Sequence, residues 1–351
     1  LEDLISQFGN KIVPFAYPTV TGEGFKGFAN LIDEVAYEYE GKVRKEVPLN
    51  DAQKAKIEEY RDVFMEKIAE SDEAMMEKYF EGESFTAEEV TKGIRVSVAA
   101  GELVPLVVGS AEKTIGADFL LDLIARYIPS PADVGAVKGT KDDVEIERKV
   151  SVNEPFSAIV FKTIIDPFVG KLSLFKVVSG KITKDTSVFN STKEREEKLG
   201  GLFFLRGKNQ IETSEMVAGD IGATSKLNFT QTGDTLCDKG NQTLYPTISY
   251  PQPTLFMAVE PKNKGDEEKI GTSLNKLTDE DPTFVVERNT ETKQLLIGGQ
   301  GNMQLTVIVD KLKQNFGVEV LLKSPKIAYR ETIRGTSTVQ GKHKKQSGGA
   351  G

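Results

Sequence analysis

The sequence predicts a multidomain chain in which an α/β region precedes an antiparallel β-barrel and an α+β sandwich of the ferredoxin-like type. Three observations support this prediction. With 351 residues, 38% of them hydrophobic, the chain is long enough for two or three cored domains. Amphipathic helix patterns dominate its first part, and short strand patterns dominate its middle. In its last part, strand and helix patterns follow one another in the order βαββαβ.

Helices with clear start signals define the first region. Asn50 is a predicted N-cap, and apolar residues recur at helical spacing from there to Ile68. Thr86 and Glu89 form a predicted capping box, and the helix that follows is expected to end near Gly101. The apolar stripes of these two helices are Ile57, Tyr60, Val63, Phe64 and Ile68, and then Val90, Ile94 and Val98.

A strand and a third helix complete this region. The run LVPLVVGSAEKTIG, residues 103–116, predicts a buried strand over 103–108 that ends in a small polar turn. The next helix is expected to end where Pro129 and Pro131 remove backbone donors. Its predicted apolar stripe is Phe119, Leu120, Leu123, Ile124 and Tyr127. We therefore expect residues 1–135 to form an α/β piece weighted toward helix.

Short strand patterns begin after residues 130–143, a stretch rich in Gly, Pro, Asp and Lys that is typical of a linker. The spacing of these strands and their Gly, Asp and Asn boundaries are typical of a small closed barrel. The barrel strands are predicted in FSAIVFKTI, DPFVGKLSLFKVVSG, DTSVFN and DIGATSKL. The order βαββαβ follows in TLFMAVEP, GDEEKIGTSLNKL, TFVVER, KQLLIGG, GNMQLTVIVDKLKQNF and VEVLLK. This order predicts the split, ferredoxin-like sandwich.

The charge balance and the cysteine content narrow the classes of partner and compartment. The chain has 53 acidic and 45 basic residues, a net charge of -8, so any contact with nucleic acid must come from local basic patches. Its single cysteine, Cys237, and the lack of an apolar run of membrane-spanning length predict a reducing, cytoplasmic environment and no membrane partner.

Several unusual short runs occur along the chain in a fixed order. They are NEPFSAIVFKTIIDPFVGKLSLFKVVSGKI, AGDIGA, TGDTLCD, EDPTFVVERNTET, VDKLKQNFGVEV and AYRETIRG. Together these runs resemble elongation factor G, the translational GTPase that drives translocation on the ribosome. The resemblance covers nearly the whole chain, and it implies a divergent member of that family and an internal fragment of the parent protein.

The resemblance implies four segments. Residues 1–137 correspond to the insert and the C-terminal part of an incomplete GTPase domain, and residues 138–250 to the β-barrel called domain II. Residues 251–328 correspond to the ferredoxin-like domain III, and residues 329–351 to a truncated start of domain IV. The implied partners are the ribosome, through small-subunit rRNA and protein, the missing N-terminal GTPase segment, and domains IV and V. The implied role is ribosome binding and relay of nucleotide state during GTP-dependent translocation.

The run GSAEK matches the fifth guanine-nucleotide motif of the family. By this resemblance Gly109, Ser110 and Ala111 form the guanine-base loop of the intact protein, in which backbone N–H groups face the base oxygen. The family usually has an aromatic residue where this chain has Glu112. Without the resemblance, an ordinary strand-to-helix turn of small residues explains the same run.

The groups that would hold the phosphates are missing from the sequence. We find no G-x-x-x-x-G-K-[ST] and no D-x-x-G, and the nearest run, GGLFFLRGKN, has the wrong glycine spacing and Asn209 in place of a hydroxyl. NKGD, residues 263–266, fits N-K-x-D but follows the Ser-Ala loop instead of preceding it, so we interpret Asp266 as a helix N-cap or first-turn acid. GTP or GDP with Mg²⁺ is implied for the intact parent, a GTP hydrolase, and no cofactor is expected for this chain.

Other chemistry is sparse. His343 is the only histidine, so no His-based triad and no multi-His metal site is predicted, and we assign no catalytic or metal-binding residue. Cys237 has no base near it in sequence and is interpreted as an inert, buried thiol. The run GKHKKQSGG predicts either an rRNA phosphate contact or an exposed hairpin.

Two departures from the family bear on function. The glycine-rich turn GGQGNMQL has Asn302 and Gln304 where elongation factor G usually carries a Glu and a His, and Ala350 stands where the family tends to carry Arg. A ribosome-protection protein of the tetracycline-resistance type or a ribosome-recycling paralogue is therefore an alternative. A nucleotide-independent adaptor is an alternative from another class.

Overall fold

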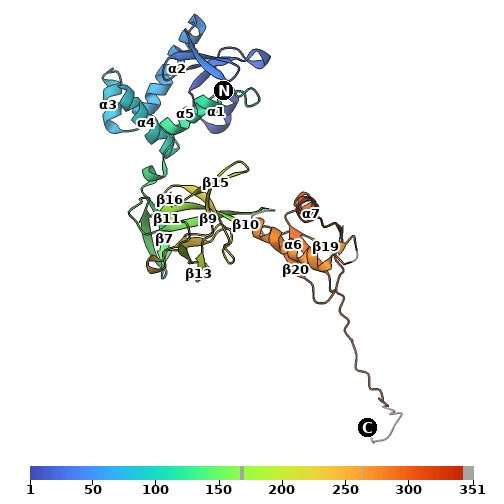
Figure 1. The fold of residues 1–351 in the computed structure, drawn as a ribbon. Coiled ribbons are helices and arrows are strands. Elements are labelled where there is room, and N and C mark those ends of the chain that lie inside the picture. The colour runs from blue at the N-terminus through green and yellow to red at the C-terminus, as the bar shows by residue number, and fades with distance from the viewer. Residues whose placement is uncertain (167–169, 264, 343–351) are drawn as a thin grey trace. The chain divides into compact units, whose positions relative to one another are not determined.

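The computed structural model describes residues 1–166, 170–263 and 265–342. The chain divides into two units, one of residues 1–135 and one that begins at Ala136. The first unit has one hydrophobic core, and the second has two, one in a barrel and one in an α+β sandwich (Figure 1). The multidomain fold class predicted from the sequence is confirmed.

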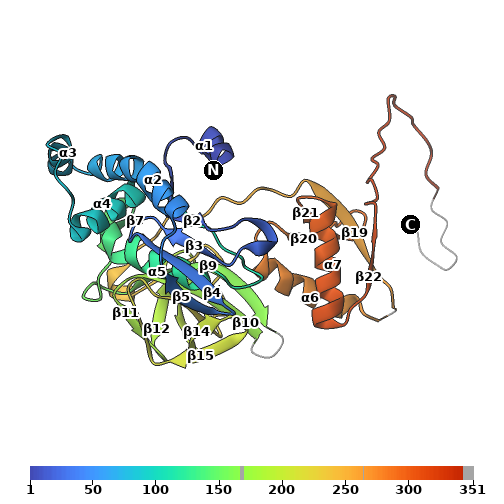
Figure 2. The same ribbon diagram turned by 90° about the horizontal axis from the view of Figure 1, so that it is seen from above.

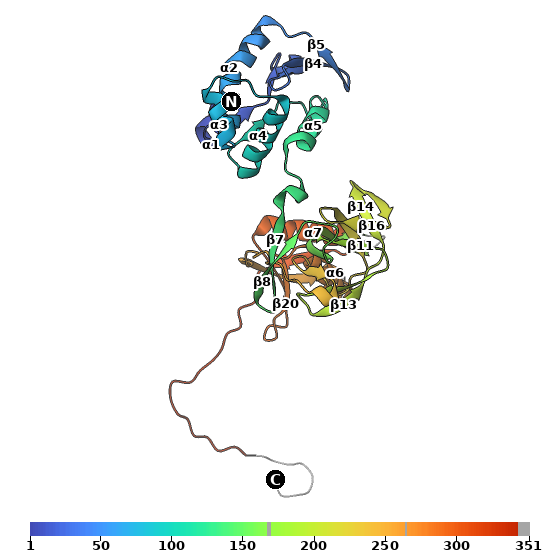
Figure 3. The ribbon, with the colours of Figure 1, turned by 90° about the vertical axis from the view of Figure 1, so that its left-hand side faces the viewer.

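The first unit combines two sheets with helices. A four-stranded antiparallel sheet has the order β2-β3-β4-β5, and a parallel pair joins β1 to β6. Figure 3 shows α4 between α2 and α5. The elements are α1 (Glu2–Phe8), β1 (Ile12–Pro14), β2 (Ala16–Pro18), η1 (Gly22–Gly24), β3 (Gly27–Asn30), β4 (Val35–Glu40), β5 (Val43–Val47), α2 (Asp51–Ala69), α3 (Glu73–Phe80), α4 (Ala87–Ala100), β6 (Val104–Leu106), α5 (Ala117–Tyr127) and η2 (Pro131–Val134).

The predicted start signals of the helices are confirmed. Asn50 caps α2, and its side chain accepts a hydrogen bond from the Gln53 amide at 2.8 Å. Thr86 and Glu89 form the capping box of α4, in which the Thr86 amide donates to Glu89 Oε2 at 2.7 Å. Gly101 ends α4 in the left-handed conformation that favours glycine.

Parts of the predicted helix stripes are wrong. Phe119, Leu123 and Tyr127 of α5 are buried, but Leu120 and Ile124 are exposed. The narrow face that α5 turns toward the core of the first unit is filled by these three buried residues alone. The predicted stripe is therefore too wide. In α2, Val63 is exposed for the same reason.

The strand predicted over 103–108 is shorter in the structure. It spans only Val104–Leu106, because its partner β1 offers three residues, Ile12–Pro14, for parallel pairing. The unit also contains α1, α3 and the four-stranded sheet β2-β3-β4-β5, none of which the helical patterns predicted.

The second unit begins with the barrel. Its eight-stranded antiparallel sheet has the order β13-β12-β18-β9-β10-β17-β14-β15, and β11 pairs with β16. The register shifts between Leu174 and Phe175 where β10 meets β9. The elements are β7 (Ala136–Lys141), β8 (Val144–Lys149), β9 (Ser157–Asp166), β10 (Gly170–Ser179), β11 (Lys181–Thr183), β12 (Ser187–Asn190), β13 (Arg195–Lys198), β14 (Leu202–Arg206), β15 (Asn209–Thr213), β16 (Glu215–Val217), β17 (Ile221–Ser225), β18 (Thr235–Cys237) and η3 (Lys239–Asn241).

These strands bear on three interpretations of the sequence. Residues 136–143 of the linker-like stretch 130–143 belong to the hairpin of β7 and β8, whose turn residues Asp142 and Asp143 have positive φ. Turn composition and linker composition are alike, so the pattern could not separate them. The run GGLFFLRGKN enters the hairpin of β14 and β15. Cys237 is buried in β18, as predicted.

The last part of the second unit is the predicted ferredoxin-like sandwich. Its antiparallel sheet has the order β20-β21-β19-β22, and α6 and α7 cover one face of this sheet (Figure 2). The elements are β19 (Leu255–Pro261), α6 (Glu267–Glu280), β20 (Val285–Arg288), β21 (Leu295–Gly299), α7 (Asn302–Phe316) and β22 (Val320–Lys323). Residues 324–342 have no regular secondary structure, and His343 and Ala350 lie outside the described residues.

Candidate functional site

The predicted guanine-base loop follows β6 and leads into α5. Two glycines fix its shape. A Cβ at Gly109 would lie 2.8 Å from the carbonyl oxygen of Ile115, and one at Gly116 would lie 2.9 Å from that of Val108. Gly116 also has φ +80°, a conformation that side chains disfavour. The loop therefore doubles back on itself closely enough to exclude any side chain at these two positions.

Backbone hydrogen bonds close this loop. The Ser110 amide donates to the Ile115 carbonyl at 2.9 Å, and the Ile115 amide donates to the Ser110 carbonyl at 3.0 Å. The Ser110 hydroxyl accepts a long hydrogen bond of 3.4 Å from the Lys113 amide. Ala111 is exposed, and its amide has no acceptor among the residues that the structure describes. The Ser110 amide is thus engaged within the loop, whereas the Ala111 amide is left available to a ligand.

A hollow of about 360 Å³ lies against this loop. Val108, Gly109, Ser110 and Lys113 form one side of it. The other side comes from the segment between β2 and β3, by way of Pro18, Thr21, Gly22 and Phe25. This size lies within the range of small-molecule sites.

Lys113 ties the two sides together. Its ammonium group donates a hydrogen bond of 3.2 Å to the carbonyl oxygen of Glu23, a residue of η1. Sequence reasoning missed the wall that Thr21 to Phe25 provide. Its only signal is the turn-forming run TGEGF, and nothing in that run indicates which distant loop it faces.

The first two turns of α5 are anchored through their acids, Asp118 and Asp122. Tyr39 donates a hydrogen bond of 2.6 Å to Asp118, and Arg44 lies 3.2 Å from the same carboxylate and 2.7 Å from Asp122. Burial and the hydrogen bond to Asp118 raise the pKa of the Tyr39 hydroxyl far above its usual value. These contacts attach the helix that follows the loop to β4 and β5.

The NKGD run belongs to the sandwich of the second unit. Asp266 is the N-cap residue of α6, where its carbonyl accepts the Ile270 amide at 2.8 Å, and no hydrogen bond from its carboxylate to the helix is found among the described residues. Lys264 lies outside the described residues. Asn263, Gly265 and Asp266 therefore lie between β19 and α6, and Asp266 holds the N-cap position expected from the sequence.

The turn before α7 forms a second polar cluster. Gln304 donates hydrogen bonds of 2.7 Å to the Asp281 carboxylate and to the Thr283 hydroxyl, and it accepts one of 2.6 Å from the Gln300 amide. Burial opposes ionisation of Asp281, but hydrogen bonds from Thr283 and Gln304 outweigh it and lower the pKa of this carboxyl. Asn302 is exposed at the first position of α7.

The described part of the chain contains neither a metal-ligating cluster nor a helix that could cross a membrane. Among residues 1–166, 170–263 and 265–342 no three His, Cys, Asp or Glu side chains gather as a metal site would require. No helix in the same ranges has the length and apolar character of a membrane span.

Comparison with known proteins identifies the barrel and the sandwich. A model described as Elongation factor G domain 2 matches residues 155–239, and one described as Elongation Factor G, domain III matches residues 250–324. The chain belongs to the elongation factor G family. The resemblance seen in the sequence is thereby confirmed, and the barrel and the βαββαβ sandwich are domains of a translation elongation factor.

A crystal structure of a protein from Thermus thermophilus is similar over most of the chain. The match has a TM-score of 0.81 and 31% sequence identity, and it covers 95% of this chain and 48% of that protein. The chain therefore spans about half the length of this relative.

Proposed function

We propose that this chain supplies the ribosome-binding and relay parts of an elongation factor G-type translation factor that acts in the cytoplasm. The observation that carries the proposal is the succession, in one chain, of a Ser-Ala loop with a hollow beside it and the family's domains 2 and III. In this proposal the barrel binds small-subunit rRNA and protein, and the sandwich relays nucleotide state toward a domain IV.

Binding to ribosomal subunits tests the first half of the proposal. We expect the purified chain to co-sediment with small ribosomal subunits at low salt, to be displaced by excess elongation factor G, and to dissociate as salt rises, because phosphate contacts release counterions. Large subunits alone serve as the matched control. Equal sedimentation with both subunits, or with neither, would count against the proposal.

Nucleotide binding tests a further part of the proposal. We propose that the intact parent binds and hydrolyses GTP with Mg²⁺, whereas these 351 residues do neither. The exposed Ala111 amide and its loop offer about 1–3 kcal/mol of hydrogen bonding, and a micromolar complex requires about 8 kcal/mol. We expect labelled GTP to show no micromolar binding to the chain in equilibrium dialysis. Micromolar affinity that depends on Mg²⁺ would overturn this part.

A ribosome-protection or ribosome-recycling role is the second candidate. It is favoured by the uncharged turn at Asn302 and Gln304, where the family's usual Glu and His would supply ionisable groups. Assays of the parent protein distinguish the three roles. Translocation is expected of an elongation factor, tetracycline release of a ribosome-protection protein, and subunit splitting of a recycling factor. A nucleotide-independent adaptor would instead bind its target equally well with GTP, GDP or no nucleotide.

A further inference from the structure

A separate hollow of about 400 Å³ lies in the sandwich, away from the Gln304 cluster. It is formed by β19, the first turns of α6, the turn between β20 and β21, and Lys326. Val259 and Ile270, both buried, give it an apolar floor. The hollow belongs to the second unit alone, so its shape does not depend on the first.

Three cations line this hollow without carboxylate partners. Arg288, Lys293 and Lys326 are exposed, and among the described residues none of them has a carboxylate oxygen within 4.0 Å. The two acids of the lining are engaged elsewhere. Glu260 pairs with Lys323 at 2.5 Å, and Glu267 accepts the Gly265 amide at 3.1 Å. The hollow therefore presents an excess of positive charge in a chain of net charge -8.

The turn that carries Lys293 is well ordered by hydrogen bonds. Asn289 Oδ1 accepts the amides of Glu291 at 3.0 Å and Thr292 at 2.9 Å, and the Asn289 amide donates to the Gln294 carbonyl at 2.9 Å. Gln294 Oε1 also accepts the Lys326 amide at 2.7 Å. The same turn thus fixes the backbone of both lysines at the hollow.

One hydroxyl of the lining is buried and unpartnered. Thr292 Oγ1 has no hydrogen-bond partner among the described residues although the atom itself is buried. A buried hydroxyl without a partner is unfavourable, so this position is better explained if a ligand supplies an acceptor. Together with three unpaired cations, it points to an anionic ligand with several oxygen atoms.

We propose that this hollow binds a phosphate-type oxyanion, through Arg288, Lys293, Lys326 and the Thr292 hydroxyl. The same chemistry is offered by a free phosphate compound and by the backbone of RNA. The proposal is independent of the function proposed above, because the isolated chain can be tested for anion binding without ribosomes or GTP.

The test measures binding of pyrophosphate and of a short oligouridine RNA to the 351-residue chain by calorimetry at low salt. The double variant Lys293→Gln/Lys326→Gln is compared with Lys162→Gln/Lys208→Gln, which removes two exposed barrel lysines and leaves the hollow intact. We expect about tenfold or more weaker binding of the tighter ligand to the first variant, since charge-assisted hydrogen bonds are lost, and little change in the second. Tighter binding of pyrophosphate than of RNA would identify a free phosphate compound as the ligand. Tighter binding of the RNA would identify a phosphate of an RNA backbone.

Thr292→Val supplies a second test, whose expected result differs from that for a threonine with a structural role alone. We expect this variant to bind the anion more weakly while its thermal midpoint without ligand stays the same or rises, because a buried unpartnered hydroxyl is removed. The proposal is overturned if the unmodified chain binds neither ligand at millimolar concentration. It is also overturned if both lysine variants lose affinity equally, or if Thr292→Val binds as the unmodified chain does.

Discussion

Gly116 is a residue at which the loop between β6 and α5 tolerates little change. It combines φ +80° with a backbone oxygen 2.9 Å from the position of a Cβ, whereas Gly101 has φ +75° and open space around it. We expect Gly116→Ala to destabilise the first unit by about 2–4 kcal/mol and Gly101→Ala by about 1 kcal/mol. Hydrogen exchange of amides in residues 1–135 measures both. If Gly116→Ala and Gly101→Ala lost the same stability, the close contact with the Val108 carbonyl would contribute nothing to the cost.

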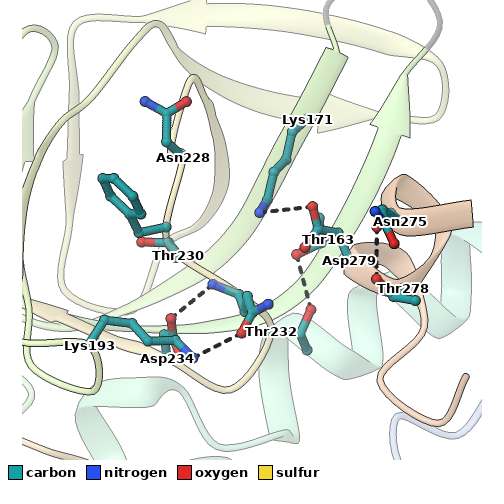
Figure 4. A network of polar contacts seen from close by, with 12 residues as sticks. Thr163, Lys171, Lys193, Asn228, Thr230, Thr232, Asp234, Asn275, Thr278 and Asp279 are labelled. Atoms are coloured by element: carbon teal, nitrogen blue, oxygen red, sulfur yellow. Dashed lines mark hydrogen bonds and ion pairs between the residues drawn. The ribbon is translucent and has the colours of Figure 1, made fainter. Parts of the chain in front are cut away.

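Glu197 is a buried carboxylate that holds the loop after β17. It is 6% exposed, and it accepts the Asn228 amide at 2.6 Å and the Thr230 hydroxyl at 2.7 Å. Figure 4 shows Asn228 and Thr230 on this loop of the barrel. We expect Glu197→Gln to destabilise the barrel by about 1.5–3 kcal/mol, because charge-assisted hydrogen bonds weaken. The matched control is Glu196→Gln, whose exposed pair with Lys239 is worth less than about 1 kcal/mol.

The stabilities of Glu197→Gln and of its control Glu196→Gln are measured by urea unfolding, which is monitored by circular dichroism. A loss for Glu197→Gln no larger than that for Glu196→Gln would contradict the role given to the buried carboxylate.

At the scale of elements, the capping box of α4 makes the stability of this helix depend on pH. The hydrogen bond from the Thr86 amide, followed by one from Lys78, lowers the pKa of Glu89 from 4.5 to about 2. A carboxyl whose folded pKa is depressed contributes stability above its unfolded pKa and loses it as pH falls toward the folded pKa. We therefore expect the contribution of Glu89 to be largely present at pH 4.5 and above, and to be lost progressively as the pH falls through about 2.

The comparison of Glu89→Gln with the unmodified chain checks this expectation. The thermal midpoints of the two should differ at about pH 6 and converge as the pH approaches 2. Glu88→Gln removes the same charge from the same turn without removing the cap. The difference in thermal midpoint between Glu88→Gln and the unmodified chain should therefore vary less with pH. A constant difference between Glu89→Gln and the unmodified chain across this pH range would refute the mechanism.

The elements differ in how far the sequence predicts them. Local signals predict the caps at Asn50 and Thr86 and the βαββαβ order, because capping and periodicity are properties of neighbouring residues. The three-residue length of β6 depends on β1, far away in the chain, and a local pattern cannot contain it. The predicted guanine-base loop follows the same division. The turn at Gly109 to Ala111 could be predicted from the sequence, but the facing wall at Thr21 to Phe25 could not.

At the scale of the whole molecule, one ion pair links the barrel to the sandwich within the second unit. Lys171 of β10 lies 3.3 Å from Asp279 in the last turn of α6 (Figure 4). Their side chains are only 17% and 28% exposed, so water screens the pair less than it screens a surface pair. The ammonium group also lies near the C-terminal end of the helix, where the dipole favours a cation. This pair is therefore suited to restrain the sandwich against the barrel.

Charge reversal tests this restraint by a double-mutant cycle. We expect Lys171→Glu or Asp279→Lys alone to broaden the distance distribution between spin labels in the barrel and in the sandwich, because like charges then face each other. The double variant should restore the narrower distribution, with a coupling energy of about 0.5–1 kcal/mol in the cycle. Reversal of the exposed pair Lys181 and Glu215, which lies wholly within the barrel, should leave the distribution unchanged. If the single variants broaden nothing, or if the double variant fails to restore the unmodified distribution, other contacts restrain the two domains and the ion pair does not.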